Sequence, residues 1–189
     1  MTEFSIRRAS AGEGTTVSAL IGGFAAEALM LRRTPEMVEL AIDDYVVAVN
    51  GRGDIVACGA IKEYSPSVAE IAAIAVASAA HGKGIGKAIV AAVEALAMKR
   101  DVYHVFALTL QPEFFGAIGY QRVDRARYPE KIRRDCLACA RRFACNEICF
   151  AKNLKVAAAA TGSVPARMAT RSKSAALARQ TVDAPNRAA

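Results

Sequence analysis

The chain has 189 residues, of which 53% are hydrophobic, and a formal net charge of +7 at pH 7. This length suits one domain with a core of its own. No stretch approaches the about 20 apolar residues of a membrane span, and a strand pattern begins at once without an apolar leader. We therefore expect a cytoplasmic protein with no membrane partner.

The N-terminal segment has the pattern of one strand and two helices. Residues 4–9 alternate like a half-buried strand. Residues 10–13 read Ser-x-x-Glu, the spacing of a capping box, and apolar side chains recur at helical period over 17–24. Thr34 followed by Pro35 predicts the N-cap and first position of a second helix.

Three strands are expected next, over residues 45–49, 55–62 and 68–76. The first two are joined by residues 50–54, which contain the Asn-Gly of a tight hairpin turn. The third follows a Ser-Pro-Ser turn at 65–67. The pattern predicts consecutive strands that pair as hairpins.

A glycine-rich stretch separates the third of these strands from a long helical pattern. Residues 82–87 read Gly-Lys-Gly-Ile-Gly-Lys. Glycines here let an anion approach N–H groups that a helix start leaves unpaired, and the lysines add positive charge. Because Ala88 follows, the stretch is not a P-loop, and its spacing is not that of a dinucleotide fingerprint. A phosphate site and an ordinary strand-to-helix loop both fit.

The remaining pattern predicts a helix over residues 85–97, a strand over 102–110, a short helix over 112–117 and strands near 119–123 and 148–154. The whole order is β-α-α-β-β-β-α-β-α-β, followed by a last strand. It predicts a mixed α/β sheet with one right-handed crossover over the glycine loop.

The cysteines leave three interpretations open. Cys58 lies alone in a strand pattern, which favours a core position. The first pair of the others has zinc-knuckle spacing, but the last lies in an apolar, strand-like run. Structural thiols, a redox-sensitive cluster and a metal site therefore remain alternatives. The four residues concerned are Cys136, Cys139, Cys145 and Cys149.

The positive charge is concentrated at the C-terminal end. Residues 155–189 hold six Lys or Arg and one Asp, with almost no large apolar side chain. Such a composition cannot bury enough surface to offset the entropy of ordering, so we expect a basic disordered tail. A nucleic-acid-binding tail is the alternative, but it lacks stacking aromatics, and we expect no nucleic-acid partner.

The glycine run after the fourth strand resembles the acetyl-CoA pyrophosphate loop of the GNAT family of N-acetyltransferases. That loop reads Arg/Gln-x-x-Gly-x-Gly/Ala. Gly84 and Gly86 match it, whereas His81 departs from it. The element order over residues 3–154 is similar to that family, as is the aromatic pair at 114–115 before Gly-Tyr. The resemblance implies a mixed, mostly antiparallel sheet flanked by helices, forming one domain over residues 3–154.

Several separated segments resemble one branch of that family, the acetyltransferase domain of N-acetylglutamate synthase. They are residues 29–36, 57–60, 69–71 with 75–76, and 106–109, while residues 128–139 resemble the short bacterial forms. The resemblance implies acetyl-CoA as co-substrate, no metal, and L-glutamate as the acceptor, in the first step of arginine synthesis. Another amino acid, a polyamine or a protein could replace glutamate. A non-catalytic acyl-CoA-binding module and a homodimer are also left open.

The same resemblance assigns the candidate site. Glu70, a carboxylate inside an apolar strand, is the best candidate base, although an outward-facing strand carboxylate fits equally. Relatives with a tyrosine at the aromatic pair use it as the acid, and both positions here are Phe. The expected acceptor-binding residues are Arg32, Arg33, Lys131 and Arg133, because carboxylates need bidentate or cationic donors. The expected cofactor-binding residues are Ile74, Ala75, Val76, His81, Gly82, Lys83, Gly84, Ile85, Gly86 and Lys87.

Overall fold

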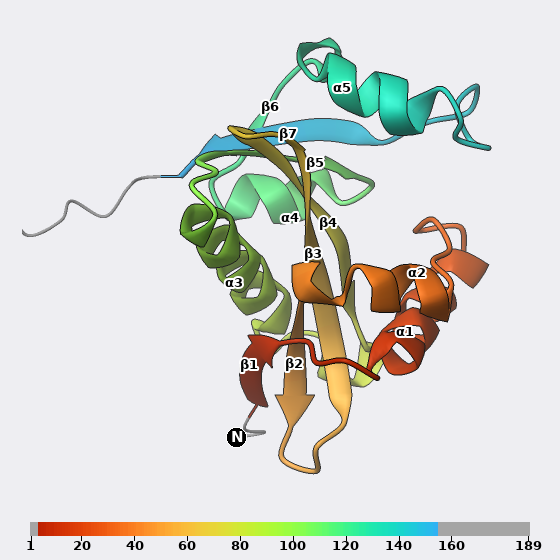
Figure 1. Cartoon of the computed structure of the whole chain (residues 1–189), viewed down its shortest axis with the longest axis vertical. Coiled ribbons are helices and arrows are strands. Elements are labelled where there is room, and N and C mark those ends of the chain that lie inside the picture. The colour runs from red at the N-terminus through yellow and green to blue at the C-terminus, as the bar shows by residue number, and fades with distance from the viewer. Residues whose placement is uncertain (1–3, 155–189) are drawn as a thin grey trace, which may run out of the picture. The chain divides into compact units, whose positions relative to one another are not determined.

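A seven-stranded sheet organises residues 4–154, the part of the chain that this computed structural model describes (Figure 1). The expected disordered tail at 155–189 lies outside the described residues. Every neighbouring pair of strands is antiparallel except β4 and β5, which confirms the mixed, mostly antiparallel sheet. In spatial order the strands are β1 (Phe4–Arg8), β2 (Tyr45–Asn50), β3 (Ile55–Ser65), β4 (Val68–Val76), β5 (His104–Thr109), β7 (Ile148–Asn153) and β6 (Gln121–Arg122).

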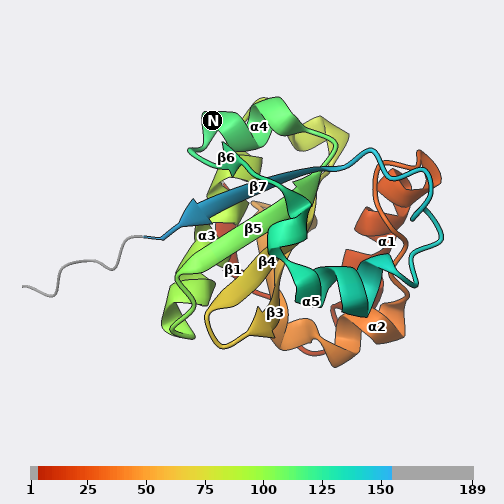
Figure 2. The same ribbon diagram turned by 90° about the horizontal axis from the view of Figure 1, so that it is seen from above.

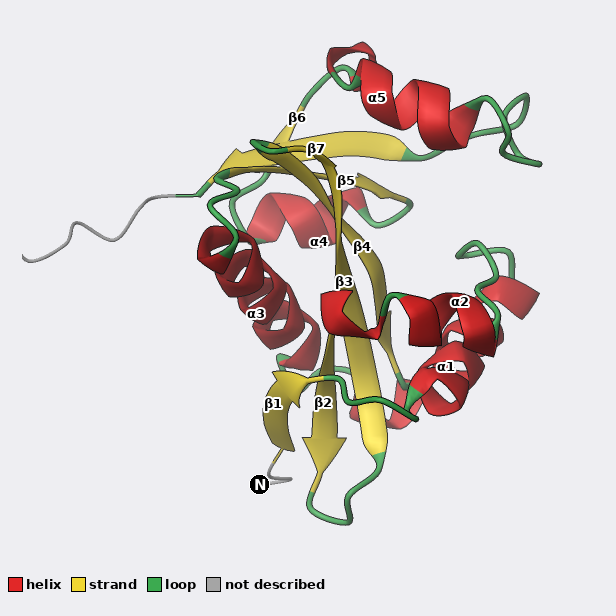
Figure 3. Cartoon of the chain, viewed as in Figure 1, coloured by secondary structure: helices red, strands yellow, loops and turns green. Residues whose placement is uncertain are grey.

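Helices cover both faces of this sheet (Figures 2 and 3). On one face α3 and α4 pack on the largest apolar cluster, and on the other α1 and α2 pack on a second cluster. Successive side chains of β2 point to opposite faces of the sheet, so Val46 and Ala48 belong to the first cluster and Tyr45 and Val47 to the second. The helices are α1 (Gly14–Ala26), α2 (Pro35–Leu40), α3 (Ile85–Lys99), α4 (Pro112–Ala117) and α5 (Pro129–Lys131), with short η1 (Ile42–Asp44), η2 (Ser78–Ala80), η3 (Arg125–Arg127) and η4 (Ile132–Cys136).

Several local predictions are confirmed. The Thr34 hydroxyl accepts from the N–H of Met37 at 3.3 Å, with Pro35 in the first turn of α2. The capping box at the start of α1 is only half formed. The Glu13 carboxylate accepts from the Ser10 N–H at 2.8 Å, but the helix begins at Gly14 without a side-chain cap. The turn of η4, which continues α5, was not predicted.

The parallel strands β4 and β5 part soon after they meet. They pair only where Val68–Glu70 lies beside His104–Phe106. Beyond Glu70 a bulge bends β4, because Ala73 and Ile74 lie opposite the single residue Gly59 of β3. Ala73 has φ 54°, a left-handed conformation that is uncommon for a residue with a Cβ atom. The carboxyl ends of the two strands therefore diverge.

Candidate functional site

A cavity of about 600 Å³ occupies the space between the diverging strands. It extends from the glycine loop before α3, past the bulge of β4, to the connection between α1 and α2. Two further parts complete its wall. One is the end of β5 with the start of α4, and the other consists of Lys131 of α5 and Glu147, which directly precedes β7. The lining residues used below are Arg33, Glu70, Ile74, Val76, Gly84, Lys87, Phe114, Lys131 and Glu147.

The glycine loop presents a helix N-terminus to the cavity. Gly82 and Gly84 have φ of 73° and 74°, which residues with a Cβ adopt only with strain. The first hydrogen bond into α3 runs from the Ala88 N–H to the Gly84 carbonyl at 3.1 Å. The N–H groups of Ile85, Gly86 and Lys87 precede it, so they can donate to an anion, and the helix dipole adds to the attraction.

The predicted cofactor-binding residues divide into two groups. The cavity is lined by Ile74, Val76, His81, Gly82, Gly84, Ile85, Gly86 and Lys87. Ala75 instead faces α1 in the second apolar cluster. Lys83 is outside the lining and donates to the Ala79 carbonyl at 2.9 Å, which closes the loop on itself. The His81 side chain also holds the loop together, since its Nε2 lies 2.7 Å from the Val76 carbonyl oxygen.

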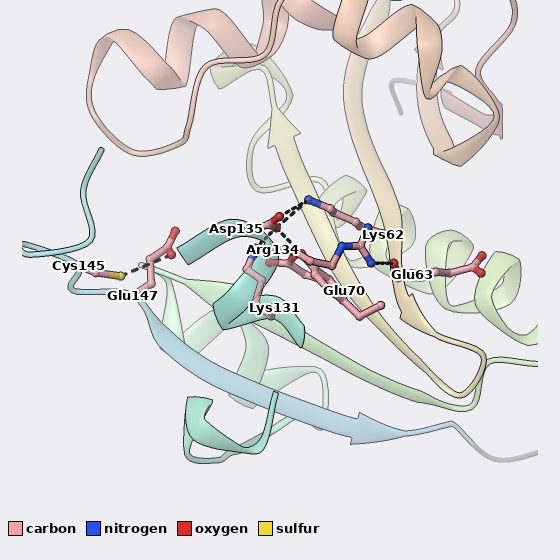
Figure 4. A network of polar contacts seen from close by, with 9 residues as sticks. Lys62, Glu63, Glu70, Lys131, Arg134, Asp135, Cys145 and Glu147 are labelled. Atoms are coloured by element: carbon pink, nitrogen blue, oxygen red, sulfur yellow. Dashed lines mark hydrogen bonds and ion pairs between the residues drawn. The ribbon is translucent and has the colours of Figure 1, made fainter. Parts of the chain in front are cut away.

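Glu70 is the centre of a buried polar network (Figure 4). Its side chain is buried, and Oε2 accepts from Tyr64 Oη and from Lys131 Nζ, both at 2.8 Å. Asp135 accepts from Lys131 Nζ at 3.0 Å and from Lys62 Nζ at 2.7 Å. It also lies within hydrogen-bond distance of Tyr64 Oη, whose single proton goes to one of the two carboxylates at a time. Within residues 4–154 no side chain donates to the second oxygen of Glu70, Oε1, so that oxygen can accept a proton or a water.

The network holds its charges firmly. Burial raises the pKa of Asp135, but hydrogen bonds from Lys62, Tyr64 and Lys131 outweigh it and keep that pKa well below its ordinary value. Burial lowers the pKa of Lys131, but the charge and hydrogen bond of Glu70 outweigh it and raise the pKa. Two anions thus face two cations, and Lys131 is charged at neutral pH.

The four cations predicted to bind the acceptor do not lie together. Arg33 is half-buried and lines the cavity, and its carbonyl accepts from the Ser18 hydroxyl at 2.7 Å. Lys131 also lines it, from the α5–η4 segment. Arg32 is exposed and outside the lining. Arg133 is exposed too, and it pairs with Glu130 at 2.7 Å on the surface of the α5–η4 segment.

Sequence analysis missed the partners of Glu70. Lys62 and Tyr64 lie on the same face of β3, two residues apart, and polar alternation at that end of the strand was an available signal. Asp135 carried no such signal, because it reaches the network only through the fold of the α5–η4 segment. Glu113, the carboxylate just before the aromatic pair, is exposed on α4 and outside the cavity lining.

Two of the five cysteines are buried, and the other three are partly exposed in the C-terminal part of the described residues. Cys58 is buried as expected, and burial raises its pKa to about 12. Cys149 is buried in β7, and Cys145 Sγ accepts from Arg125 at 3.1 Å. Among residues 4–154 no three His, Cys, Asp or Glu side chains are grouped to hold a metal ion. No helix in that range is long and apolar enough to cross a membrane.

The chain is similar to known proteins in both sequence and fold. The model of the Acetyltransferase (GNAT) family matches residues 24–122. An uncharacterized N-acetyltransferase of Chlorobaculum tepidum is 37% identical over 149 residues, which are 79% of this chain and 96% of that protein. An amino-acid acetyltransferase of Mycobacterium tuberculosis is 30% identical over 121 residues, 63% of this chain and 69% of that protein.

A solved structure has the same fold. N-acetylglutamate synthase from Neisseria gonorrhoeae, complexed with coenzyme A and N-acetyl-glutamate, superposes with a TM-score of 0.73 at 25% identity. The match covers 82% of this chain and 36% of that protein, so the chain spans about a third of its length. The resemblance seen in the separated sequence segments is thereby confirmed.

Proposed function

Because the chain belongs to the GNAT acetyltransferase family, we propose that it transfers the acetyl group of acetyl-CoA to the amino group of an acidic amino acid, with L-glutamate as the acceptor. The observation that carries this proposal is the composition of one cavity. Anion-binding N–H groups of the glycine loop, an arginine without a carboxylate partner among residues 4–154, and a buried carboxylate on β4 all line it. The N. gonorrhoeae enzyme, with coenzyme A and N-acetyl-glutamate bound, supports the choice of ligands.

The glycine loop would hold the pyrophosphate of acetyl-CoA. Its donors are the N–H groups at the start of α3, with Lys87 as an added charge. The pantetheine arm would lie along β4 from Val76 towards the bulge at Ala73, where the strand edge has no β5 partner. Unpaired backbone groups on that edge can donate to the thioester oxygen as it gains negative charge.

Transfer would proceed by direct attack of the amine on the thioester. The neutral nitrogen forms a bond to the carbonyl carbon, its proton passes to Glu70 Oε1 directly or through one water, and the C–S bond breaks. The thiolate then takes a proton from water, because Phe114 and Phe115 supply no acid at the aromatic pair. When Glu70 returns its proton to solvent, that proton neutralises the hydroxide left after water protonates the thiolate, and the enzyme is back in its starting state.

Acceptor selection would rest mainly on Arg33. Lys131 also lines the cavity, but its charge is already matched by Glu70 and Asp135 at 2.8 and 3.0 Å. No carboxylate of the described residues pairs with Arg33, so it can take a carboxylate of the acceptor in a bidentate contact. Arg32 and Arg133, both exposed, are secondary candidates that would act only at the entrance.

One observation favours a second candidate function. Glu70 and Glu147 both line the cavity, and carboxylates attract a cationic acceptor such as a diamine or lysine. The fold and the thioester chemistry would be unchanged, and only the acceptor would differ.

The test is release of free thiol from acetyl-CoA by the full chain, with glutamate, aspartate, glutamine, lysine and spermidine offered in parallel. We expect turnover with glutamate, and an Arg33→Gln variant whose kcat/KM for glutamate falls about 100-fold, since a charged bidentate contact contributes about 3 kcal/mol. Its KM for acetyl-CoA should not change. Arg32→Gln is the matched comparison, because it removes the neighbouring charge outside the cavity lining.

Each other outcome assigns a different function. Turnover with spermidine or lysine alone would reject glutamate and favour the cationic acceptor. Equal losses in Arg32→Gln and Arg33→Gln would reject Arg33 as the specific carboxylate ligand. Binding of acetyl-CoA without turnover on any acceptor would favour an acyl-CoA-binding module.

A further inference from the structure

Five Lys, Arg, Asp or Glu side chains line the cavity between the diverging strands, and three of them already have a partner or a role. Lys87 lies at the glycine loop, where the pyrophosphate of acetyl-CoA would bind. Glu70 and Lys131 pair with each other at 2.8 Å. The two that remain have opposite charges, and they are Arg33 and Glu147.

Glu147 reaches the cavity from the start of β7. It directly precedes Ile148, which pairs with Thr109, so its backbone lies beside the end of β5. Residues 108–111, at that end, line the cavity as well. The side chain of Glu147 is half-buried, and in Figure 4 it lies apart from the network around Glu70. The cavity wall therefore contains a second carboxylate, from a different segment of the chain.

No Lys or Arg among residues 4–154 forms an ion pair with Glu147. Its Oε2 accepts only a weak contact from Cys145 Sγ, at 3.8 Å. Arg125 lies nearby, but its guanidinium donates to Cys145 Sγ at 3.1 Å. That hydrogen bond is the main reason that the pKa of Arg125 is raised, and the charge of Glu147 adds to it from farther away. The carboxylate of Glu147 can therefore bind a cation that enters the cavity.

Arg33 is the opposite case in the same cavity. It is half-buried in the connection between α1 and α2, and its guanidinium has no carboxylate partner among the described residues, Glu147 included. Partly buried charges are costly unless they are paired. A cavity with one cation and one anion left to pair is complementary to a zwitterion.

We propose that Glu147 binds the protonated amino group of the acceptor while Arg33 holds a carboxylate of the same molecule, so that the cavity selects a zwitterionic amino acid. The amino group of such an acid carries a proton at neutral pH, since its pKa lies above about 7. A carboxylate that accepts from an ammonium group forms a charge-assisted hydrogen bond, about twice as strong as a neutral one. A polyamine would leave Arg33 unpaired, and a dicarboxylic acid without an amine would leave Glu147 unpaired.

The role of Glu147 rests on the proposed function for the reaction, transfer to an amine, but not for the choice of glutamate. Glu147 holds the ammonium group as the acceptor binds, whereas Glu70 takes a proton from the nitrogen during attack. A change at Glu147 should therefore act on the KM for the acceptor, and a change at Glu70 on kcat.

The experiment is a calorimetric titration of glutamate and of glutarate into the full chain saturated with coenzyme A. Glutarate has both carboxylates of glutamate and no amino group, so the difference between the two ligands isolates the amine. Glu147→Gln should weaken glutamate binding about tenfold, the loss of one charge-assisted hydrogen bond, and leave glutarate binding unchanged or tighter. Arg33→Gln should weaken both ligands, because both carry the carboxylate.

Two further variants control for the substitution itself. Glu147→Asp keeps the charge on a shorter side chain and should recover part of the glutamate binding. Glu113→Gln removes an exposed carboxylate of α4 outside the cavity lining, so both ligands should bind as in wild type. Glu147→Gln should keep the melting temperature of wild type, because the charge that it removes has no cationic partner among residues 4–154.

Thiol release adds a kinetic measurement that a merely structural role would not affect in the same way. In Glu147→Gln the KM for glutamate should rise about tenfold, with kcat and the KM for acetyl-CoA within about twofold of wild type. If aspartate or glutamine is acetylated and glutamate is not, glutamate is wrong as the acceptor. The same increase in the KM for that acid would still support the role of Glu147.

The remaining outcomes overturn the proposal. Equal weakening of glutamate and glutarate in Glu147→Gln, or no weakening of either, would mean that Glu147 only shapes the wall. Turnover with spermidine alone would show that the acceptor needs no carboxylate, and the pairing with Arg33 would be wrong. If no amino acid binds or is acetylated, Glu147 has no ammonium group to recognise.

Discussion

At the scale of single residues, the structure decides how the side chain of Glu70 is held. The sequence allowed either an outward-facing carboxylate or a base beside a cleft. The side chain is 6% exposed and lines the cavity, with Oε2 held by Tyr64 and Lys131. Those two contacts fix the orientation of the carboxylate, and no side chain of residues 4–154 donates to Oε1. A group held in this way can act as a base without first reorganising.

Replacing this carboxylate should slow the chemical step. We expect Glu70→Gln to lower kcat by about 100-fold or more, the usual contribution of a general base, with the KM for acetyl-CoA unchanged. Steady-state thiol release checks this. Glu113→Gln, which alters an exposed carboxylate on α4, should keep full activity. A Glu70→Gln enzyme within about threefold of wild type would leave proton removal to water alone.

At the scale of elements, the glycine loop and the start of α3 are the part of the cavity that the sequence predicted most directly. The loop needs two left-handed residues, Gly82 and Gly84, to turn from η2 into the helix. Its N–H groups then point at the cavity because they precede the first helical hydrogen bond. The α5–η4 segment is the opposite case. Its regular stretches are too short for a periodic signal, and tertiary contacts hold it.

Two identical substitutions should have opposite effects on stability. Gly84→Ala places a Cβ at φ 74°, which should lower the free energy of unfolding by about 1 kcal/mol and raise the KM for acetyl-CoA. Gly22→Ala lies inside α1 with no atom within 4 Å of the added Cβ, and should stabilise by about 0.5–1 kcal/mol. Urea unfolding of both variants measures the difference. Equal signs would mean that the conformation of Gly84 is not what constrains the loop.

At the scale of the whole molecule, the polar network joins segments far apart in the chain. Lys62 and Tyr64 come from β3, Glu70 from β4, and Lys131 and Asp135 from the α5–η4 segment. The side chains of Lys62, Glu70, Lys131 and Asp135 can be followed in Figure 4. The network therefore fixes that segment over the sheet and closes one wall of the cavity. Charge balance between two carboxylates and two lysines makes the arrangement sensitive to acid.

Acid unfolding should depend on Asp135. Its pKa lies below the ordinary value of about 3.9, so its stabilising contribution is complete above that pH and is lost as the pH falls through the folded-state pKa. We expect Asp135→Asn to lower the free energy of unfolding at pH 7 by about 2 kcal/mol. Below about pH 4 the free energy of unfolding of this variant should fall less steeply with pH than that of the wild type.

The measurement is urea unfolding at several pH values between about 2 and 7, a range that includes the titration of the carboxylates. Asp43→Asn is the control, because its carboxylate is 91% exposed and makes only a surface pair with Arg8. A pH dependence of Asp135→Asn that parallels wild type would show that other carboxylates control acid unfolding.

The sequence by itself determined the order of the strands and most helices, the cap at Thr34 and the helix start at the glycine loop. Each of these depends on neighbouring residues, through side-chain periodicity, turn chemistry and N-terminal capping. The mixed sheet followed from that order, and the family from several segments that agree in sequence.

Only the tertiary structure decided which charges serve the site. Arg33 lines the cavity while its neighbour Arg32 is exposed, although both lie in the connection between α1 and α2. Lys131 pairs with Glu70, some sixty residues earlier in the chain, at 2.8 Å. Such pairings form only where the α5–η4 segment meets β3 and β4, and no local pattern encodes that contact.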